Sequence, residues 1–165
     1  MRLYHFHGTV EAVDYSIEIL RAQGHYVVAK FKVDGVRHKL VGDRVYPNDG
    51  GSFRYPVVAG QEIYTAGPKV CGRIQVYTAY IPARQSTLYS VDDDFSKAAM
   101  FGGASFFVMA ALLVLTGLSL PDIHTRYFAF FVALMPVGVG ILLEIIGINI
   151  RKSRAWIDRI KGDHA

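Results

Sequence analysis

The chain has few of the residues on which covalent and metal chemistry depends. Its 165 residues include a single cysteine, Cys71, so it contains no cysteine pair for a disulfide or a redox motif. One free cysteine fits a reducing compartment. The sequence also lacks a nucleophile elbow and a glycine-rich phosphate loop that ends in Lys-Ser or Lys-Thr. We therefore expect a protein that is not an enzyme and holds no cofactor.

Charged residues are nearly absent from one long stretch of the chain. The ionisable side chains between residues 98 and 150 are Asp122, His124, Arg126 and Glu144. At about 1.5 Å per residue, the apolar segments 98–120 and 127–150 each cover the ~30 Å hydrocarbon core of a bilayer. Neither segment has the polar stripe of a soluble helix. Because the connector between them is short, residues 95–150 predict a transmembrane hairpin of two antiparallel helices.

Basic residues crowd the far end of the second apolar segment. The tail, residues 151–165, contains Arg151, Lys152, Arg154, Arg159 and Lys161. The positive-inside bias places this tail in the cytoplasm, and two crossings return the N-terminus to the same side. No continuous apolar run of the signal-peptide kind precedes the hairpin. We expect a membrane protein with two spans and both termini in the cytoplasm.

The region before the hairpin, residues 1–94, has the pattern of a β domain. Apolar and polar residues alternate at strand period over 12–20 and 25–33, and Asp34-Gly35 predicts a tight turn into a third strand at 36–41. Two further strands are expected at 60–67 and 72–81, separated by Pro68. Five strands without a helix among them predict a small all-β barrel or a half-open sandwich.

The order of these segments resembles that of the oligonucleotide/oligosaccharide-binding (OB) barrel family. The carrying features are GTVEAV, the hairpin, a loop, the glycine-led strand GQEIYTAG of the form G-x-x-[IV]-x-[TV]-x-G, and a final strand. With the helix pair included, residues 7–120 are similar to small bacterial membrane proteins that carry a cytosolic β domain. Some of these are related to the β domain of membrane-bound ubiquitin ligases, but the chain has no RING-type Cys/His cluster. The resemblance implies an OB-like domain at the cytoplasmic face of a bacterial inner membrane.

The predicted β-hairpin, residues 25–41, offers one candidate ligand face. Its basic side chains are Lys30, Lys32, Arg37 and Lys39. A solvated strand face explains the same pattern without a ligand, and residues 1–97 carry 12 Lys/Arg against 10 Asp/Glu, a net charge of only +2. Barrels that bind nucleic acid use a basic groove with stacking aromatics. We therefore do not expect nucleic acid as a partner.

A metal site is a further alternative on the β domain. His5 and His7 point to the same side of an extended segment, and His25 or His38 could complete a ligand set. Nothing in the spacing requires a metal, and histidines are common on exposed strands. We expect no metal site.

The apolar segments contain small and polar residues that bear on helix packing. They are Gly102, Gly103, Ser105, Pro136, Gly138, Gly140 and Glu144. Small residues allow two helix backbones to approach, and proline favours a kink. A carboxyl within a membrane is a candidate functional group, and Ser105 or another subunit is the expected partner of Glu144. The alternative is that Glu144 lies near the interface and only fixes helix packing.

The tail predicts a short amphipathic C-terminal helix. Trp156, Ile157 and Ile160 fall on one side of this helix, and the basic residues lie mostly elsewhere. This pattern favours a helix on the anionic headgroups of the cytoplasmic leaflet, anchored by its basic side chains and by Trp156. The same apolar edge could instead dock on the β domain or on a partner.

Two hypotheses of different classes follow. The first is a non-enzymatic interaction or adaptor module, which includes an immunity or exclusion protein, acting through a protein partner or as a homo-oligomer. The second is an oligomeric transport or channel-type subunit in which Glu144 lines a polar path. Substitution of Glu144 by Gln separates the two, because only a transport path depends on the carboxylate.

Overall fold

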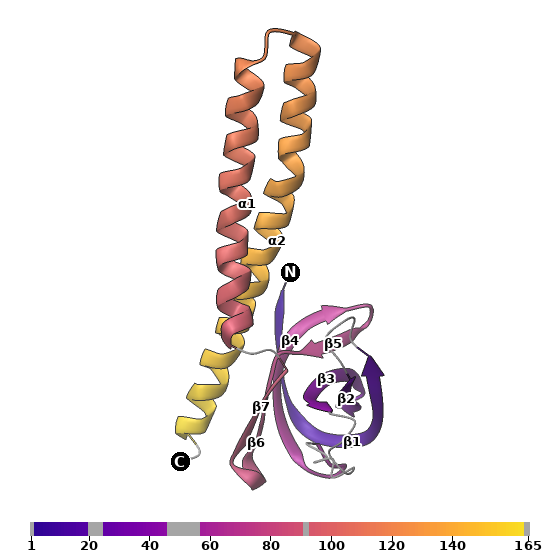
Figure 1. The fold of residues 1–165 in the computed structure, drawn as a ribbon. Coiled ribbons are helices and arrows are strands. Elements are labelled where there is room, and N and C mark those ends of the chain that lie inside the picture. Colours follow the sequence, from indigo (N-terminus) through magenta and orange to yellow (C-terminus); the bar gives the residue numbers. More distant parts are fainter. Residues whose placement is uncertain (1, 20–24, 46–56, 91–92, 164–165) are drawn as a thin grey trace. The chain divides into compact units, whose positions relative to one another are not determined.

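The chain forms two compact units in a computed structural model that describes residues 2–19, 25–45, 57–90 and 93–163. The first unit, the β domain with the tail, comprises residues 1–92 and 149–165. The second unit, the helical hairpin, comprises residues 93–148. Figure 1 shows the strands of the first unit and the two helices. The tail therefore belongs with the β domain, although it is continuous in sequence with the second helix.

The first strand is long enough to serve two parts of the sheet. Strand β1 (Leu3–Ile19) pairs antiparallel with β4 (Glu62–Val70) through its first residues and with β2 (His25–Val33) from Val10 onward. A register shift between Val10 and Ala12 marks the change of partner. Such an irregularity bends a strand and increases its twist. One continuous strand can therefore belong to both parts.

The remaining strands complete a seven-stranded mixed sheet (Figure 1). Strand β3 (Val36–Val45) pairs antiparallel with β2 and parallel with β5 (Arg73–Val76), and β5 pairs antiparallel with β4. Because β4 also pairs with β1, these pairings return to the strand from which they began. Strands β6 (Thr78–Ile81) and β7 (Ser86–Tyr89) continue the sheet beyond β4, joined by a 3₁₀ turn at Pro82–Arg84.

The sheet confirms part of the predicted strand pattern and corrects the rest. The hairpin of β2 and β3 turns at Asp34 and Gly35, whose φ angles of 50° and 72° suit a tight two-residue turn. The strand expected at 72–81 is two strands, and β7 was not predicted. Pro68 lies inside β4, where it does not separate two strands as predicted. The turn falls instead at Cys71 and Gly72, both with positive φ.

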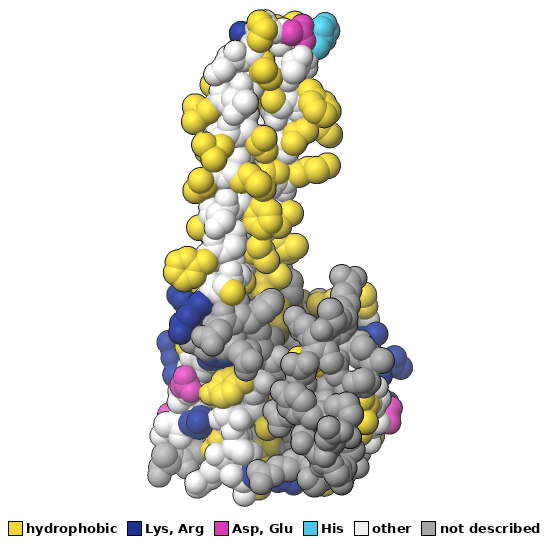
Figure 2. All heavy atoms as spheres, viewed as in Figure 1, with side chains coloured by type: hydrophobic (Ala, Val, Ile, Leu, Met, Phe, Trp, Pro, Cys, Tyr) yellow, Lys and Arg dark blue, Asp and Glu magenta, His cyan; other side chains and the backbone are white. Residues whose placement is uncertain are grey.

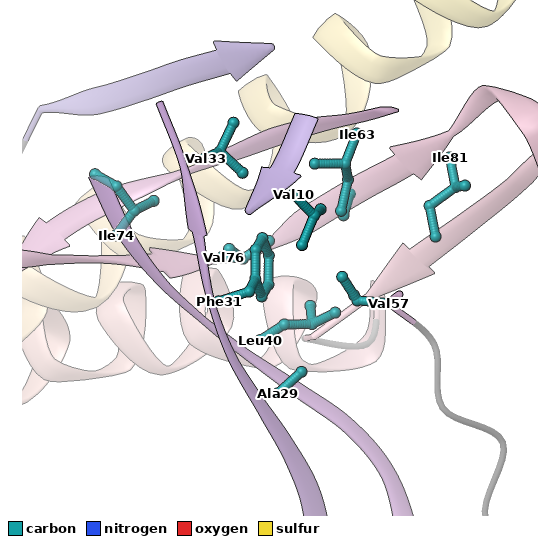
Figure 3. Packing of buried hydrophobic residues seen from close by; sticks show 11 residues of the cluster. Val10, Ala29, Phe31, Val33, Leu40, Val57, Ile63, Ile74, Val76 and Ile81 are labelled. Atoms are coloured by element: carbon teal, nitrogen blue, oxygen red, sulfur yellow. The ribbon is translucent and has the colours of Figure 1, made fainter. Parts of the chain in front are cut away.

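The core of the β domain is built from the inward-facing residues of these strands. Phe31, Leu40, Ile63 and Val76 are buried, and Figure 3 shows them together with the other members of the cluster. Gly67 is required where two backbones meet, because a Cβ there would lie 2.0 Å from the carbonyl oxygen of Gln75. Close packing of this kind fixes one arrangement of the strands.

The helical hairpin consists of α1 (Asp93–Ser119) and of α2 (Ile123–Asp163) as far as residue 148. Both helices are long and apolar enough to cross a membrane. Figure 2 shows hydrophobic side chains along both of them. Helix α2 continues through Pro136 as far as Asp163. The residues expected to form a separate C-terminal helix are therefore the last turns of α2.

Candidate functional site

The β domain contains a hollow of about 720 Å³ between its hairpin and the turn that joins β4 to β5. Its volume lies within the range of small-molecule sites. The basic side chains that line it are Lys30, Lys32, Arg37, Lys69 and Arg73. Asp14 is the acidic residue in the same lining. The hollow is therefore predominantly cationic.

Two rows of side chains cross the hairpin, and the first is neutralised. In this neutralised row, Lys30 and Lys39 lie opposite each other on β2 and β3. Both contact Glu18 of β1, with distances to its carboxylate oxygens of 2.9 Å from Lys30 Nζ and 2.5 Å from Lys39 Nζ. These bonds, first to Lys39 and then to Lys30, lower the pKa of Glu18 to about 2. Glu18, together with Asp14 at the position of β1 in register with Lys30, balances the charge of the two lysines.

The second row keeps its positive charge. In this cationic row, Lys32 lies opposite Arg37, and the neighbouring position on β1 is Ala12. The parallel register of His38 with Ile74 puts Arg73 on β5 next to Arg37. Within the described residues, none of these three cations has an Asp or Glu within ion-pair distance. Like charges directly opposite each other in a sheet are destabilising.

A buried histidine lies in the lining beneath these charges. His38 is 2% exposed, and its ring stacks on Phe31 at a centroid distance of 5.3 Å. Its Nδ1 donates to the carbonyl of Val36 at 2.9 Å, and Nε2 has no hydrogen-bond partner among the described atoms. Burial lowers the pKa of His38. The ring is therefore neutral near pH 7, with its acceptor nitrogen unsatisfied.

The tail contacts the opposite part of the sheet, formed by β1, β4, β6 and β7. Trp156 stacks on His5 at a centroid distance of 4.4 Å, and Ile157 is fully buried. Ser153 donates to the carbonyl of Ile150, so its 3.1 Å hydrogen bond to Thr78 has the Thr78 hydroxyl as donor. The apolar edge of the tail therefore packs on the β domain. This is the second of the two arrangements that the sequence allowed, the first being contact with lipid.

The basic residues of the tail divide into two groups. Arg154 is half-buried, with its guanidinium carbon 4.9 Å from the centre of the Tyr89 ring. Such a cation–π contact ties the side chain to the β domain. Lys161 is also half-buried. Arg151, Lys152 and Arg159 are exposed, and for them the contact with anionic headgroups stays a prediction.

The histidines of β1 have partners within the β domain. His7 contacts Glu62 through Nε2 and stacks on Tyr64 at a centroid distance of 4.1 Å. Burial lowers the pKa of His5, which stacks on Trp156. No group of three or more His, Cys, Asp or Glu that could hold a metal occurs in the described part of the chain. The side chain of His25 lies outside the description.

The helical hairpin brings several of its predicted residues together. A Cβ at Gly103 would lie 2.8 Å from Glu144 Cγ and 3.1 Å from the carbonyl oxygen of Gly140. A Cβ at Gly102 would lie 3.5 Å from Leu143 Cδ1. The helices therefore approach closely at the depth of Glu144, as expected from the small residues.

Two other residues of the helical hairpin, Ser105 and Gly138, have different neighbours from those predicted. Ser105 donates to the carbonyl of Phe101 in its own helix, at 2.9 Å, and is not shown as the partner of Glu144. A Cβ at Gly138 would meet no described atom within 4 Å, so this glycine lies away from the seam. Gly117 and Gly147, which the sequence did not single out, lie against Ala129 and Met100.

The structure adds residues to the predicted ligand face and reassigns one of them. Lys30, Lys32 and Arg37 line the hollow as a group, whereas Lys39 belongs to the neutralised row and is not in the lining. Lys69 and Arg73 were missed. The Cys71-Gly72 pair signals the turn that joins β4 to β5, but the position of this turn beside β3 depends on the parallel pairing of β3 with β5.

Comparison of the chain with protein-family models, with curated proteins and with solved structures returned no match. The structure shows the coarser part of the resemblance, a β domain followed by two apolar helices. The OB-like label and the membrane-protein family stay predictions.

Proposed function

We propose that this chain is a membrane-anchored, non-enzymatic interaction module that presents an OB-like domain at the cytoplasmic face of a bacterial inner membrane. The observation that carries the proposal is the contact between the tail and the β domain. Helix α2 contains an apolar segment long enough to span a bilayer, and its last turns bury Ser153 and Ile157. One continuous helix thus supplies both the proposed membrane-spanning segment and the residues that pack on the β domain.

The same contact supports the proposed topology. The stack of Trp156 on His5 and the bond between Thr78 and Ser153 require that the tail and the β domain occupy one compartment. An even number of crossings between them satisfies this requirement. The exposed basic residues Arg151 and Lys152 then favour the cytoplasmic side. They also supply the charge for contact with anionic lipid.

The strand pairings support the OB-like assignment. An OB barrel is a five-stranded, partly open Greek-key barrel. Strands β1, β2, β3, β5 and β4 pair in a series that returns to β1, with β3 and β5 parallel. Ligands of such barrels bind over strands 2 and 3 and the loop between strands 4 and 5. The hollow lies against β2, β3 and the turn between β4 and β5.

The transport hypothesis has one residue in its favour and one observation against it. Glu144 is a carboxyl inside an apolar helix, which is by default a functional candidate. Its side chain, however, lies against Gly103 in a seam where the two backbones approach closely. This position suits a packing role, in which the aliphatic part of the side chain fills the space above a glycine.

Substitution of Glu144 by Gln separates the two functions in the full chain reconstituted into lipid vesicles and nanodiscs. If the chain is an interaction module, Glu144→Gln should leave the mass of the protein complex in nanodiscs, and therefore its number of subunits, unchanged. Vesicles that contain the wild-type protein or the variant should conduct no more ions than protein-free vesicles. Gly138→Ala is the matched control within α2, because that position meets no described neighbour. An ion flux through the wild-type protein that Glu144→Gln abolishes and Gly138→Ala preserves would overturn the proposal.

A further inference from the structure

We infer that the cationic row of the β domain binds the phosphate group of a small ligand whose remaining part occupies the hollow. The inference rests on the proposed binding function and names the chemistry of its ligand. The cationic row is formed by Lys32, Arg37 and Arg73, which lie on three adjacent strands. All three side chains line the hollow.

The contrast between the two rows carries the argument. Glu18 reaches both Lys30 and Lys39, so the neutralised row has its counter-charge within the domain. The position on β1 in register with Lys30 is Asp14, whereas the position in register with Lys32 is Ala12, a side chain that cannot neutralise a cation. The sheet therefore concentrates positive charge at its cationic row, and a bound anion would relieve the repulsion.

The geometry of the donors suits phosphate. An arginine presents its N–H groups as a planar fork that matches two oxygens of a phosphate, and a lysine adds a compact charge. Arg37 and Arg73 supply two forks, and Lys32 supplies the compact charge from the opposite strand. All three side chains are exposed, so an incoming anion can reach them.

The rest of the lining favours a small molecule over a polymer. Val13 and Val36, both half-buried, provide apolar surface beside the charges. Phe31 is 3% exposed, so it offers no face for stacking of successive bases. Asp14 in the same lining would repel a continuous phosphate backbone. These features fit one phosphate group attached to a partly apolar body.

Such a phosphate has two sources, a soluble phosphate ester or the headgroup of an anionic phospholipid. Isothermal titration of the full chain distinguishes them, with the protein held in nanodiscs of neutral phosphatidylcholine. The soluble probes are inorganic pyrophosphate and glycerol 3-phosphate. The lipid probe is dihexanoyl phosphatidylglycerol, used below the concentration at which it forms micelles.

The decisive comparison is between Lys32→Gln/Arg37→Gln and the control Lys39→Gln. Loss of two charge-assisted bonds should weaken binding by about tenfold or more, whereas Lys39→Gln should change it by less than about threefold. Binding of a soluble probe that follows this pattern identifies a soluble ester as the source. Binding of the lipid probe alone, with the same pattern, identifies a headgroup.

Two results would overturn the inference. One is no detectable binding of any of the three probes at millimolar concentration. The other is an equal loss of affinity in Lys39→Gln and in the double variant, because the neutralised row would then contribute as much as the cationic row. Neither result would alter the side of the membrane on which the β domain lies, so a failure here is distinguishable from a failure of the proposed function.

Discussion

The β domain buries many of its large apolar side chains, whereas the helical hairpin exposes many of its own. In the β domain, Ile63 and Val76 have no exposed surface. In the hairpin, Phe101 is 75% exposed and Met135 is 68% exposed. The first arrangement removes apolar surface from water by folding, and the second leaves that surface uncovered within the chain, as the proposed membrane location requires. Hydrophobicity alone therefore does not identify where a side chain packs.

Glycine has a related role in both units. Gly67 lets β4 approach the backbone at Gln75, and Gly103 lets α1 approach the backbone at Gly140. In the β domain this contact adds to a buried core. In the membrane that we propose for the hairpin, lipid would cover the outer side chains, and close backbone approach would supply a larger share of the association between helices.

The largest expected contrast comes from one chemical change made in each unit. Leu40→Ala removes a buried side chain from the β domain and should lower the free energy of unfolding by about 2–5 kcal/mol. Leu134→Ala, at a position that is 65% exposed, should change it by less than about 1 kcal/mol. Urea unfolding in nanodiscs, followed by the fluorescence of Trp156, measures the loss in Leu40→Ala, and a dodecyl sulfate titration in mixed micelles, followed by circular dichroism, measures the loss in Leu134→Ala. Equal losses would contradict the division between the two units.

A smaller contrast lies within the hairpin. Gly103→Leu should push the helices apart, because a Cβ at this position already meets Glu144 and Gly140. Overpacking of this kind costs about 1–3 kcal/mol. Gly138→Leu is the matched control. A titration with dodecyl sulfate in mixed micelles, followed by circular dichroism, should show earlier unfolding for Gly103→Leu alone. Similar curves for the two variants would remove Gly103 from the seam.

The smallest effect concerns the neutralised row. The pKa of Glu18 is lowered from 4.5 to about 2 in the folded state, so its stabilising contribution is present above pH 4.5. That contribution is lost as the pH falls from 4.5 through 2. Glu18→Gln should destabilise the β domain at pH 7 by up to about 1 kcal/mol. The difference between the two proteins in urea unfolding should shrink across this pH range. A difference that is constant with pH would exclude the carboxylate as its cause.

Local signals account for the elements that could be predicted from the sequence. The turn between β2 and β3 needs only Asp34 and Gly35, and the helices need only their apolar runs. The pairing of β3 with β5 joins residues such as His38 and Ile74, which no local pattern relates. The split of the expected strand at Tyr77 also depends on distant partners, because Tyr77 bonds to Ala66 and Ser90.

The candidate site shows the same limit. The alternation of apolar and polar residues along the β-hairpin predicts that Lys30, Lys32, Arg37 and Lys39 face outward. It cannot predict which of these cations have a counter-charge and which do not. That distinction depends on Glu18, which lies on another strand. The tail is a parallel case, because the apolar edge formed by Trp156 and Ile157 fits a lipid surface or a protein surface equally well. Only the positions of His5 and Thr78 decide between them.

The accessibility of Cys71 tests the central claim most directly. This residue is exposed on the β domain and is the single cysteine of the chain, so the natural protein needs no engineering. The full chain would be expressed in a bacterial host and treated with a maleimide that cannot cross membranes. We expect modification in inverted inner-membrane vesicles and none in intact spheroplasts. Modification in intact spheroplasts would place the β domain outside the cytoplasm and contradict the account.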